Sequence, residues 1–140
     1  MSQGHWEHYS HPADIGIRGA GPTREEAFAQ AALALTAVIA DLDTIVPREA
    51  VEIVCDEDDD DLLFYGWLGA LLYEMGTRGM LFNRFEIQAA PTGLKATAWG
   101  ERVDVRKHEP AVEAKAATYA DLKVRREADS RWVAQCVVDV

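Results

Sequence analysis

Two aspartates lie within apolar, strand-like stretches near opposite ends of the 140-residue sequence. Asp14 belongs to HPADIGI (residues 11–17), and Asp139 belongs to WVAQCVVDV (132–140), which ends at Val140. If the last strand pairs near the ADIGI strand, Asp14, Asp139 and the Val140 carboxylate converge. Two such charges about 5 Å apart repel by roughly 3 kcal/mol at an effective dielectric of 20. Their convergence would require a cation, a bound base or protonation, whereas unrelated strand-end aspartates would require none.

The donor atoms of these three groups indicate which ion they would bind. Oxygen-only ligands favour a hard cation, namely Ca²⁺, Mg²⁺ or Mn²⁺. Two other patterns are weaker. His5, His8 and His11 are spaced three apart, but Pro12 disfavours a helix there, and on a strand such neighbours face opposite sides. The run DEDDDD (56–61) lacks the glycine and distal Glu of an EF-hand loop, so we interpret it as a solvated helix start.

Motifs of a self-sufficient enzyme are missing from the sequence. It contains no Gly-x-Ser-x-Gly, phosphate loop or dinucleotide fingerprint, and Gly16, Gly19 and Gly21 do not follow the fingerprint order. We therefore expect no catalytic residues. Cys55 and Cys136 lie in apolar, strand-like segments, which favours buried free thiols over a disulfide.

Composition narrows the class of partner. Acidic residues outnumber basic ones by 24 to 14, for a net charge of −10. This charge opposes tight, direct binding to nucleic acid and favours cations and basic protein surfaces. The N-terminus has no signal-peptide pattern, and no apolar run approaches the roughly 18 residues needed to span a bilayer. We expect a soluble cytoplasmic protein with no membrane contact and one domain over residues 1–140.

Hydrophobic periodicity predicts the elements that position these residues. Strands are expected at 6–9, 15–20 and 51–55, and hairpins at 85–100 and 122–140. A first helix begins at Thr23, with Glu26 completing a capping box, and runs to about Ala40. A second helix follows the acidic run and ends near Gly79. The order predicts an α+β fold: a single domain with a mainly antiparallel β-sheet and two principal amphipathic helices.

Several strings together resemble one family. HPADIGIRGAG, VPREAVEI, LLFYGWLGALLYEM, AWGE, HEPAVEAKAATYADL and the ending VVDV are similar to the archease family, nearly end to end and in family order. The resemblance implies a non-enzymatic accessory protein of the RtcB-type, GTP-dependent RNA ligase in tRNA splicing and RNA repair. Such a protein promotes guanylylation and multiple turnover of the ligase, and it meets RNA only through the ligase.

The resemblance also implies site residues. The family's metal ligands correspond to Asp14, Asp139 and Val140, with calcium the expected ion, while Lys115 matches a family lysine that could contact the ligase or a phosphate. An exposed strand lysine would be the plain alternative for Lys115. Two departures are Pro12, where the family has threonine, and Ala120, where it has histidine. Two other functional classes remain open: a stand-alone metal-dependent phosphoester hydrolase and a general chaperone or scaffold.

Overall fold

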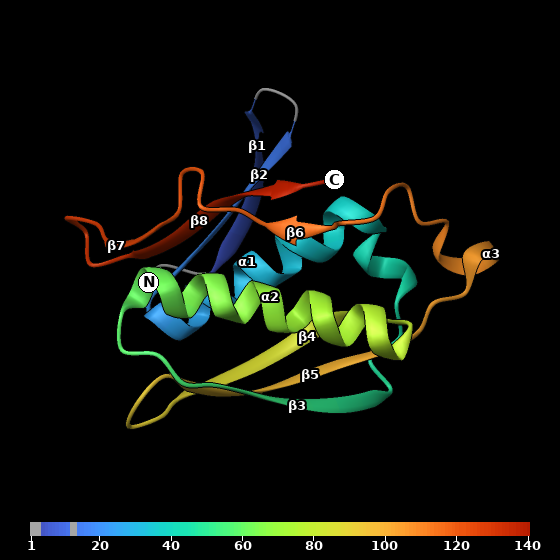
Figure 1. The fold of residues 1–140 in the computed structure, drawn as a ribbon, viewed down its shortest axis with the longest axis horizontal. Helices are drawn as coiled ribbons and strands as arrows, with labels where there is room; N and C mark the ends of the chain where they lie inside the picture. Colours follow the sequence, from blue (N-terminus) through green and yellow to red (C-terminus); the bar gives the residue numbers. More distant parts are fainter. Residues whose placement is uncertain (1–3, 12–13) are drawn as a thin grey trace.

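The computed structural model describes residues 4–11 and 14–140. Its elements confirm the α+β class (Figure 1). In chain order they are β1 (His5–His11), β2 (Asp14–Gly21), α1 (Arg24–Ile39), the 3-10 turn η1 (Leu42–Thr44), β3 (Glu49–Cys55), α2 (Asp60–Arg78), β4 (Met80–Ala89), β5 (Leu94–Arg102), α3 (Val105–His108), β6 (Ala116–Ala117), β7 (Lys123–Arg126) and β8 (Trp132–Asp139).

The predicted start of α1 at Thr23 and the predicted end of α2 at Gly79 are confirmed. The Thr23 hydroxyl accepts a hydrogen bond of 3.0 Å from the Glu26 N–H at the start of α1. The Asp59 carboxylate caps α2 by accepting from the Leu62 N–H at 2.9 Å. Gly79 ends α2 in the left-handed region at φ 62°, where glycine carries no Cβ penalty. Local sequence therefore determines these boundaries.

The strands form two antiparallel sheets rather than one, with α1 and α2 between them (Figure 1). The first sheet has the order β1-β2-β8-β6, and β7 also pairs with β8. The second sheet has the order β3-β5-β4, and α1 contacts both β2 and β4. Helix α1 is therefore covered on two sides, which explains why apolar residues surround much of it instead of forming one narrow stripe.

Close packing of α1 on the first sheet depends on small residues. A Cβ at Gly19 of β2 would lie 2.2 Å from the Ala31 nitrogen and 2.3 Å from the Ala27 oxygen, so only glycine fits there. On the other side, the Phe28 and Phe64 rings join α1 to α2 with centroids 5.0 Å apart. Helix α1 is thereby held close to the pair of strands that carries the two aspartates.

Two further features bear on the sequence predictions. Both cysteines are free thiols, with Cys136 buried and Cys55 half-buried. Burial raises the pKa of Cys136 to about 12 and also raises that of Cys55, because a thiolate loses hydration there. In the described part of the chain, neither α1 nor α2 nor any shorter helix combines the length and apolar character needed to cross a bilayer.

Candidate functional site

Strands β2 and β8, from opposite ends of the chain, lie side by side in the first sheet. Here β2 pairs with β8 in antiparallel register up to Ile15, which lies opposite Val138. Continuing that register by one residue puts Asp14 next to Asp139. The strand pairing on which the sequence hypothesis depended is therefore present, although the two residues are 125 positions apart in the 140-residue chain.

The two aspartates share one face of the sheet. Ile15 and Val138 belong to or pack on the hydrophobic core, beside α1. Because successive side chains on a strand point to opposite faces, Asp14 and Asp139 are directed away from that core. Asp139 is exposed and Asp14 half-buried, so both carboxylates remain accessible to an ion or a partner. Directly opposed antiparallel residues have Cβ atoms about 4.5–5.5 Å apart, within bridging reach of one cation.

The third predicted ligand, Val140, follows Asp139 directly. Its side chain is half-buried and packs against the core, so its hydrophobic group serves packing while its main chain continues beyond the sheet. Only main-chain oxygens of Val140 are thus available for a cation. Two carboxylates on one face plus a main-chain oxygen make an oxygen-only donor set, and that set fits a hard cation such as Ca²⁺.

We call the end of the β2–β8 pair that carries Asp14, Asp139 and Val140 the aspartate corner. Lys115 lies beside it. Its backbone N–H donates to the Asp139 carbonyl at 2.8 Å, and the next residue, Ala116, pairs with Asp139 in the sheet. The Lys115 side chain is exposed. Tertiary structure therefore brings this lysine to the aspartate pair, whereas in the sequence it stands in a polar connection without a clear period.

The alternative metal patterns are not assembled. His8 Nε2 contacts the Ala34 carbonyl of α1 at 2.8 Å, whereas strand alternation directs His5 and His11 to the opposite face. His11 pairs with Asp14 in the ladder. Among residues 4–11 and 14–140, no set of three or more His, Cys, Asp and Glu side chains is arranged as a metal site.

The acidic run begins α2, as the sequence predicted, but two of its carboxylates also contact distant segments instead of being only solvated. Besides the Asp59 cap, Asp60 forms an ion pair with Arg24 at 2.8 Å. Asp61 accepts a 2.7 Å hydrogen bond from the Val124 N–H and so joins α2 to β7. These contacts stabilise the helix start and its packing.

Tyr9 is a neighbour that sequence reasoning missed. Its ring lies flat over Gly16, where a Cβ would come within 2.3 Å of the ring, and the Arg18 guanidinium stacks on it at 4.6 Å. The Tyr9 hydroxyl donates to Asp121 at 3.4 Å. Burial, followed by the nearby Asp121 charge, raises the pKa of Tyr9 to about 12. Tyr9 and Gly16 are opposite each other in the ladder, one position further along this face than Asp14, and only the register reveals this.

A buried polar cluster at the far end of β5 was also missed. Glu101 accepts hydrogen bonds from Lys107 at 2.6 Å, from the Val46 N–H at 2.9 Å and from buried His108 Nε2 at 2.9 Å. The Asp104 N–H donates to His108 Nδ1, so Nε2 carries the proton given to Glu101. These donors, Lys107 first, lower the pKa of Glu101 to about 2. The cluster ties the loops around α3 and before β3 to the second sheet.

Comparison with known proteins gives one consistent result. The family model for the archease protein family (MTH1598/TM1083) matches residues 6–140. The chain is 43% identical to the protein archease of Pyrococcus abyssi and 45% identical to that of Thermococcus gammatolerans, in each case over 96% of this chain and 98% of the relative. The solution structure of Methanobacterium thermoautotrophicum protein 1598 is similar, with a TM-score of 0.79 and 28% identity over 96% of this chain and 98% of that one.

Proposed function

Because the chain belongs to the archease family, we propose that it acts as an accessory protein of an RtcB-type, GTP-dependent RNA ligase. In this role it promotes guanylylation and multiple turnover of the ligase during tRNA splicing and RNA repair in the cytoplasm. It does not join RNA ends itself, and it contacts RNA only through the ligase.

The observation that carries this proposal is the pairing of β2 with β8, which brings Asp14 and Asp139 to the same end of the sheet on one face. That corner is an accessible group of oxygens on rigid strands. The main chain of Lys115 lies beside it, because the Lys115 N–H is bonded to the Asp139 carbonyl. An accessory protein needs only an accessible group of ligands that its partner can contact. A self-sufficient hydrolase also needs a general base near its metal.

Asp14, Asp139 and a main-chain oxygen of Val140 would hold the ion, most suitably Ca²⁺, with Mg²⁺ or Mn²⁺ as alternatives. When bound, the ion supplies positive charge that neutralises the carboxylates and offers an acceptor for a ligand from the partner. The residues of this chain fix the geometry of the aspartate corner. Pairing of β2 with β8 positions the two aspartates, and the Tyr9 ring covers Gly16 beside them.

Charge supports the choice of partner. This protein carries −10, while an enzyme that handles RNA and GTP needs a basic cleft. Opposite charges accelerate encounter and fix the orientation of the two proteins. The same negative charge disfavours direct association with RNA phosphates, so the ligase is the natural intermediary.

The test measures ligase guanylylation at limiting ligase with wild-type protein, Asp14→Ala and Asp139→Ala. We expect both variants to remain folded, as judged by circular dichroism, and to lose stimulation at least tenfold. Glu52→Ala is the matched control, because Glu52 is an exposed strand carboxylate on the second sheet. Normal stimulation by both aspartate variants would contradict the proposal. Phosphoester turnover by the protein alone would instead support the hydrolase class.

A further inference from the structure

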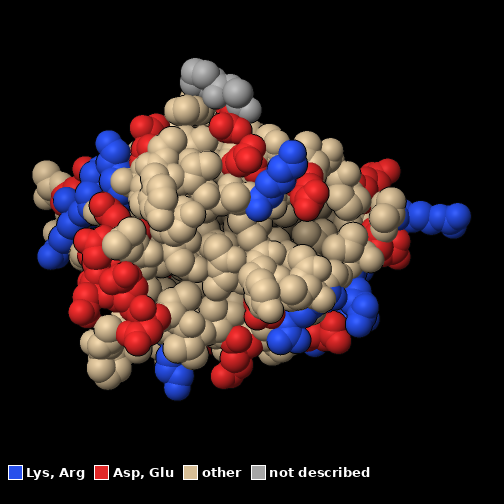
Figure 2. All heavy atoms as spheres, viewed as in Figure 1, with Lys and Arg blue, Asp and Glu red and all other residues tan. Residues whose placement is uncertain are grey.

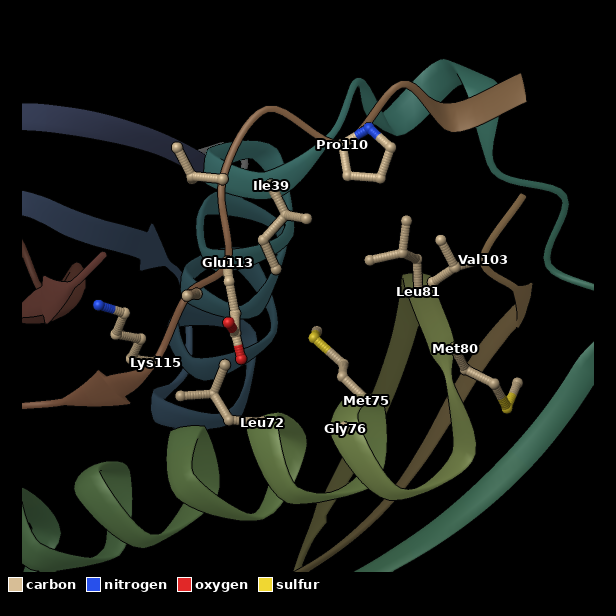
Figure 3. Close-up of a pocket in the computed structure, with 12 residues that line it drawn as sticks. Ile39, Leu72, Met75, Gly76, Met80, Leu81, Val103, Pro110, Glu113 and Lys115 are labelled. Atoms are coloured by element: carbon tan, nitrogen blue, oxygen red, sulfur yellow. The ribbon is translucent and has the colours of Figure 1, made fainter. Parts of the chain in front are cut away.

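A largely apolar cavity of about 290 Å³ lies between the ends of α1 and α2 and the segment 110–115. Ile39, Met75 and Leu81 supply its apolar walls, and Figure 3 shows their side chains directed into it. Methionine is unbranched and adaptable, so a wall containing Met75 can adjust to the shape of an inserted group. The cavity is therefore suited to receiving an apolar side chain.

The cavity is adjacent to the aspartate corner described above. Glu113 and Lys115 both line it, and the Lys115 N–H is bonded to the Asp139 carbonyl at 2.8 Å. Glu113 stands two residues before Lys115 in the chain, so the wall of the cavity continues directly from the residue that is bonded to Asp139. A protein that contacts Asp139 therefore meets the cavity within the same interface.

The polar groups at the cavity indicate the charge of the occupant. Figure 3 shows the Glu113 carboxylate turned toward the cavity and the Lys115 side chain turned away from it. Figure 2 shows a hollowed, mostly uncharged central area on this side of the molecule, with charged side chains mainly around its edge. An apolar centre with a polar rim is the usual anatomy of a protein interface. The carboxylate at the wall, together with the net charge of −10, favours a basic partner surface.

We infer that this cavity receives an apolar side chain, flanked by lysine or arginine, from the surface of the RNA ligase. The inference rests on the proposed function and extends it by naming the anchor that seats the ligase beside the aspartate corner. The volume lies at the lower limit of small-molecule pockets, about 300–1,000 Å³, and a single large side chain suits it better. Buried anchors of this kind supply much of the affinity of an interface.

Gly76 allows the cavity to be filled without disturbing the fold. Gly76 is exposed and lines the cavity one helical turn after Leu72, and a Cβ there would meet no atom within 4 Å. Leucine is also a better helix former than glycine. We expect Gly76→Leu to melt no lower than wild type, to bind the ligase with at least a tenfold higher Kd, and to stimulate guanylylation only at correspondingly higher concentration.

Gly66→Leu is the matched control, since Gly66 lies in the same helix with open space around it but outside the cavity, about 15 Å away along the axis. Its Kd should stay within twofold of wild type. A second pair of variants introduces a positive charge, which would repel the lysine or arginine proposed beside the inserted side chain. Val112→Arg changes an exposed residue of the cavity wall, and Val54→Arg changes an exposed residue of β3. We expect only Val112→Arg to weaken binding tenfold or more.

The outcomes separate the two proposals. If wild-type protein binds and stimulates the ligase while Gly76→Leu and Val112→Arg do so equally well, the cavity is not the anchor site and only this inference is overturned. If Gly66→Leu weakens binding as much as Gly76→Leu, the outer face of α2 makes the contact and the inference is again overturned. If wild-type protein neither binds nor stimulates the ligase, the proposed function is overturned as well.

Discussion

Replacing Asp139 by asparagine should change stability in opposite directions with and without calcium. The register places Asp139 beside Asp14 on one face of neighbouring strands, where Cβ atoms are about 5 Å apart. Two charges at that separation repel by about 1 kcal/mol in water and about 3 kcal/mol at an effective dielectric of 20. Because Asp139 is exposed and Asp14 half-buried, we expect the variant to gain about 1 kcal/mol of unfolding free energy when no ion is present.

Calcium should make the wild type more stable than Asp139→Asn. An ion that binds only the folded state stabilises it by about 2.7 kcal/mol when its concentration is 100 times Kd. Calcium should stabilise the wild type by this free energy. It should stabilise Asp139→Asn by much less, because one charged ligand has been removed. For a chain of this size, 1 kcal/mol corresponds to about 4 °C in Tm. Wild type should therefore melt below the variant in chelator and several degrees above it in calcium.

The assay is urea and thermal unfolding followed by tryptophan fluorescence, in EGTA and in Ca²⁺, with Mg²⁺ and Mn²⁺ run in parallel. Glu52→Gln removes an exposed strand carboxylate on the other sheet and should respond to calcium like wild type. Equal stabilisation of wild type and Asp139→Asn by calcium would refute the assignment of Asp139 as a ligand. A variant less stable than wild type in EGTA would refute the repulsion argument.

Three other predictions follow from the same structure. Adding several residues after Val140 should weaken Ca²⁺ binding in titration calorimetry if the terminal carboxylate is the ligand, and should leave it unchanged if the carbonyl is. Because the Glu101 pKa is lowered to about 2, its charge stabilises the fold above about pH 4.5 and this contribution is lost as pH falls toward 2. Glu101→Gln should therefore lose about 2 kcal/mol in urea unfolding at pH 7, with the gap to wild type closing in acid. Gly19→Ala should lose about 1–3 kcal/mol, since its Cβ would overlap the Ala31 backbone, and thermal melting measures this loss.

Local signals predicted the elements well for physical reasons that act within a few residues. The Thr23 cap and left-handed Gly79 each satisfy backbone groups of their own helix, so sequence alone indicates where α1 begins and where α2 ends. The two hairpins, β4 with β5 and β7 with β8, were likewise predicted from alternation and turn residues. The separation of the strands into two sheets was not predicted, because pairing between distant strands leaves no local pattern.

The candidate site divides in the same way. The sequence identified Asp14 and Asp139 as charges in apolar strands with Val140 beside Asp139, and the resemblance to archeases supported this set and added Lys115. It did not indicate Tyr9, because a tyrosine over a glycine on the next strand is recognised only from the register. The burial of His108 against Glu101 was equally hidden, since the two residues meet only after the intervening loop folds back.

The sequence by itself determined the types of residue available here: carboxylates in strands, an acidic surface charge, capped helices and the family to which the chain belongs. Only the tertiary structure decided which of these residues are neighbours. The pairing of β2 with β8, the sandwich of helices between two sheets and the cavity beside residue 115 all arise from contacts between distant segments. Those contacts depend on how whole faces fit together, and side-chain packing at that range is not encoded in any short stretch of residues.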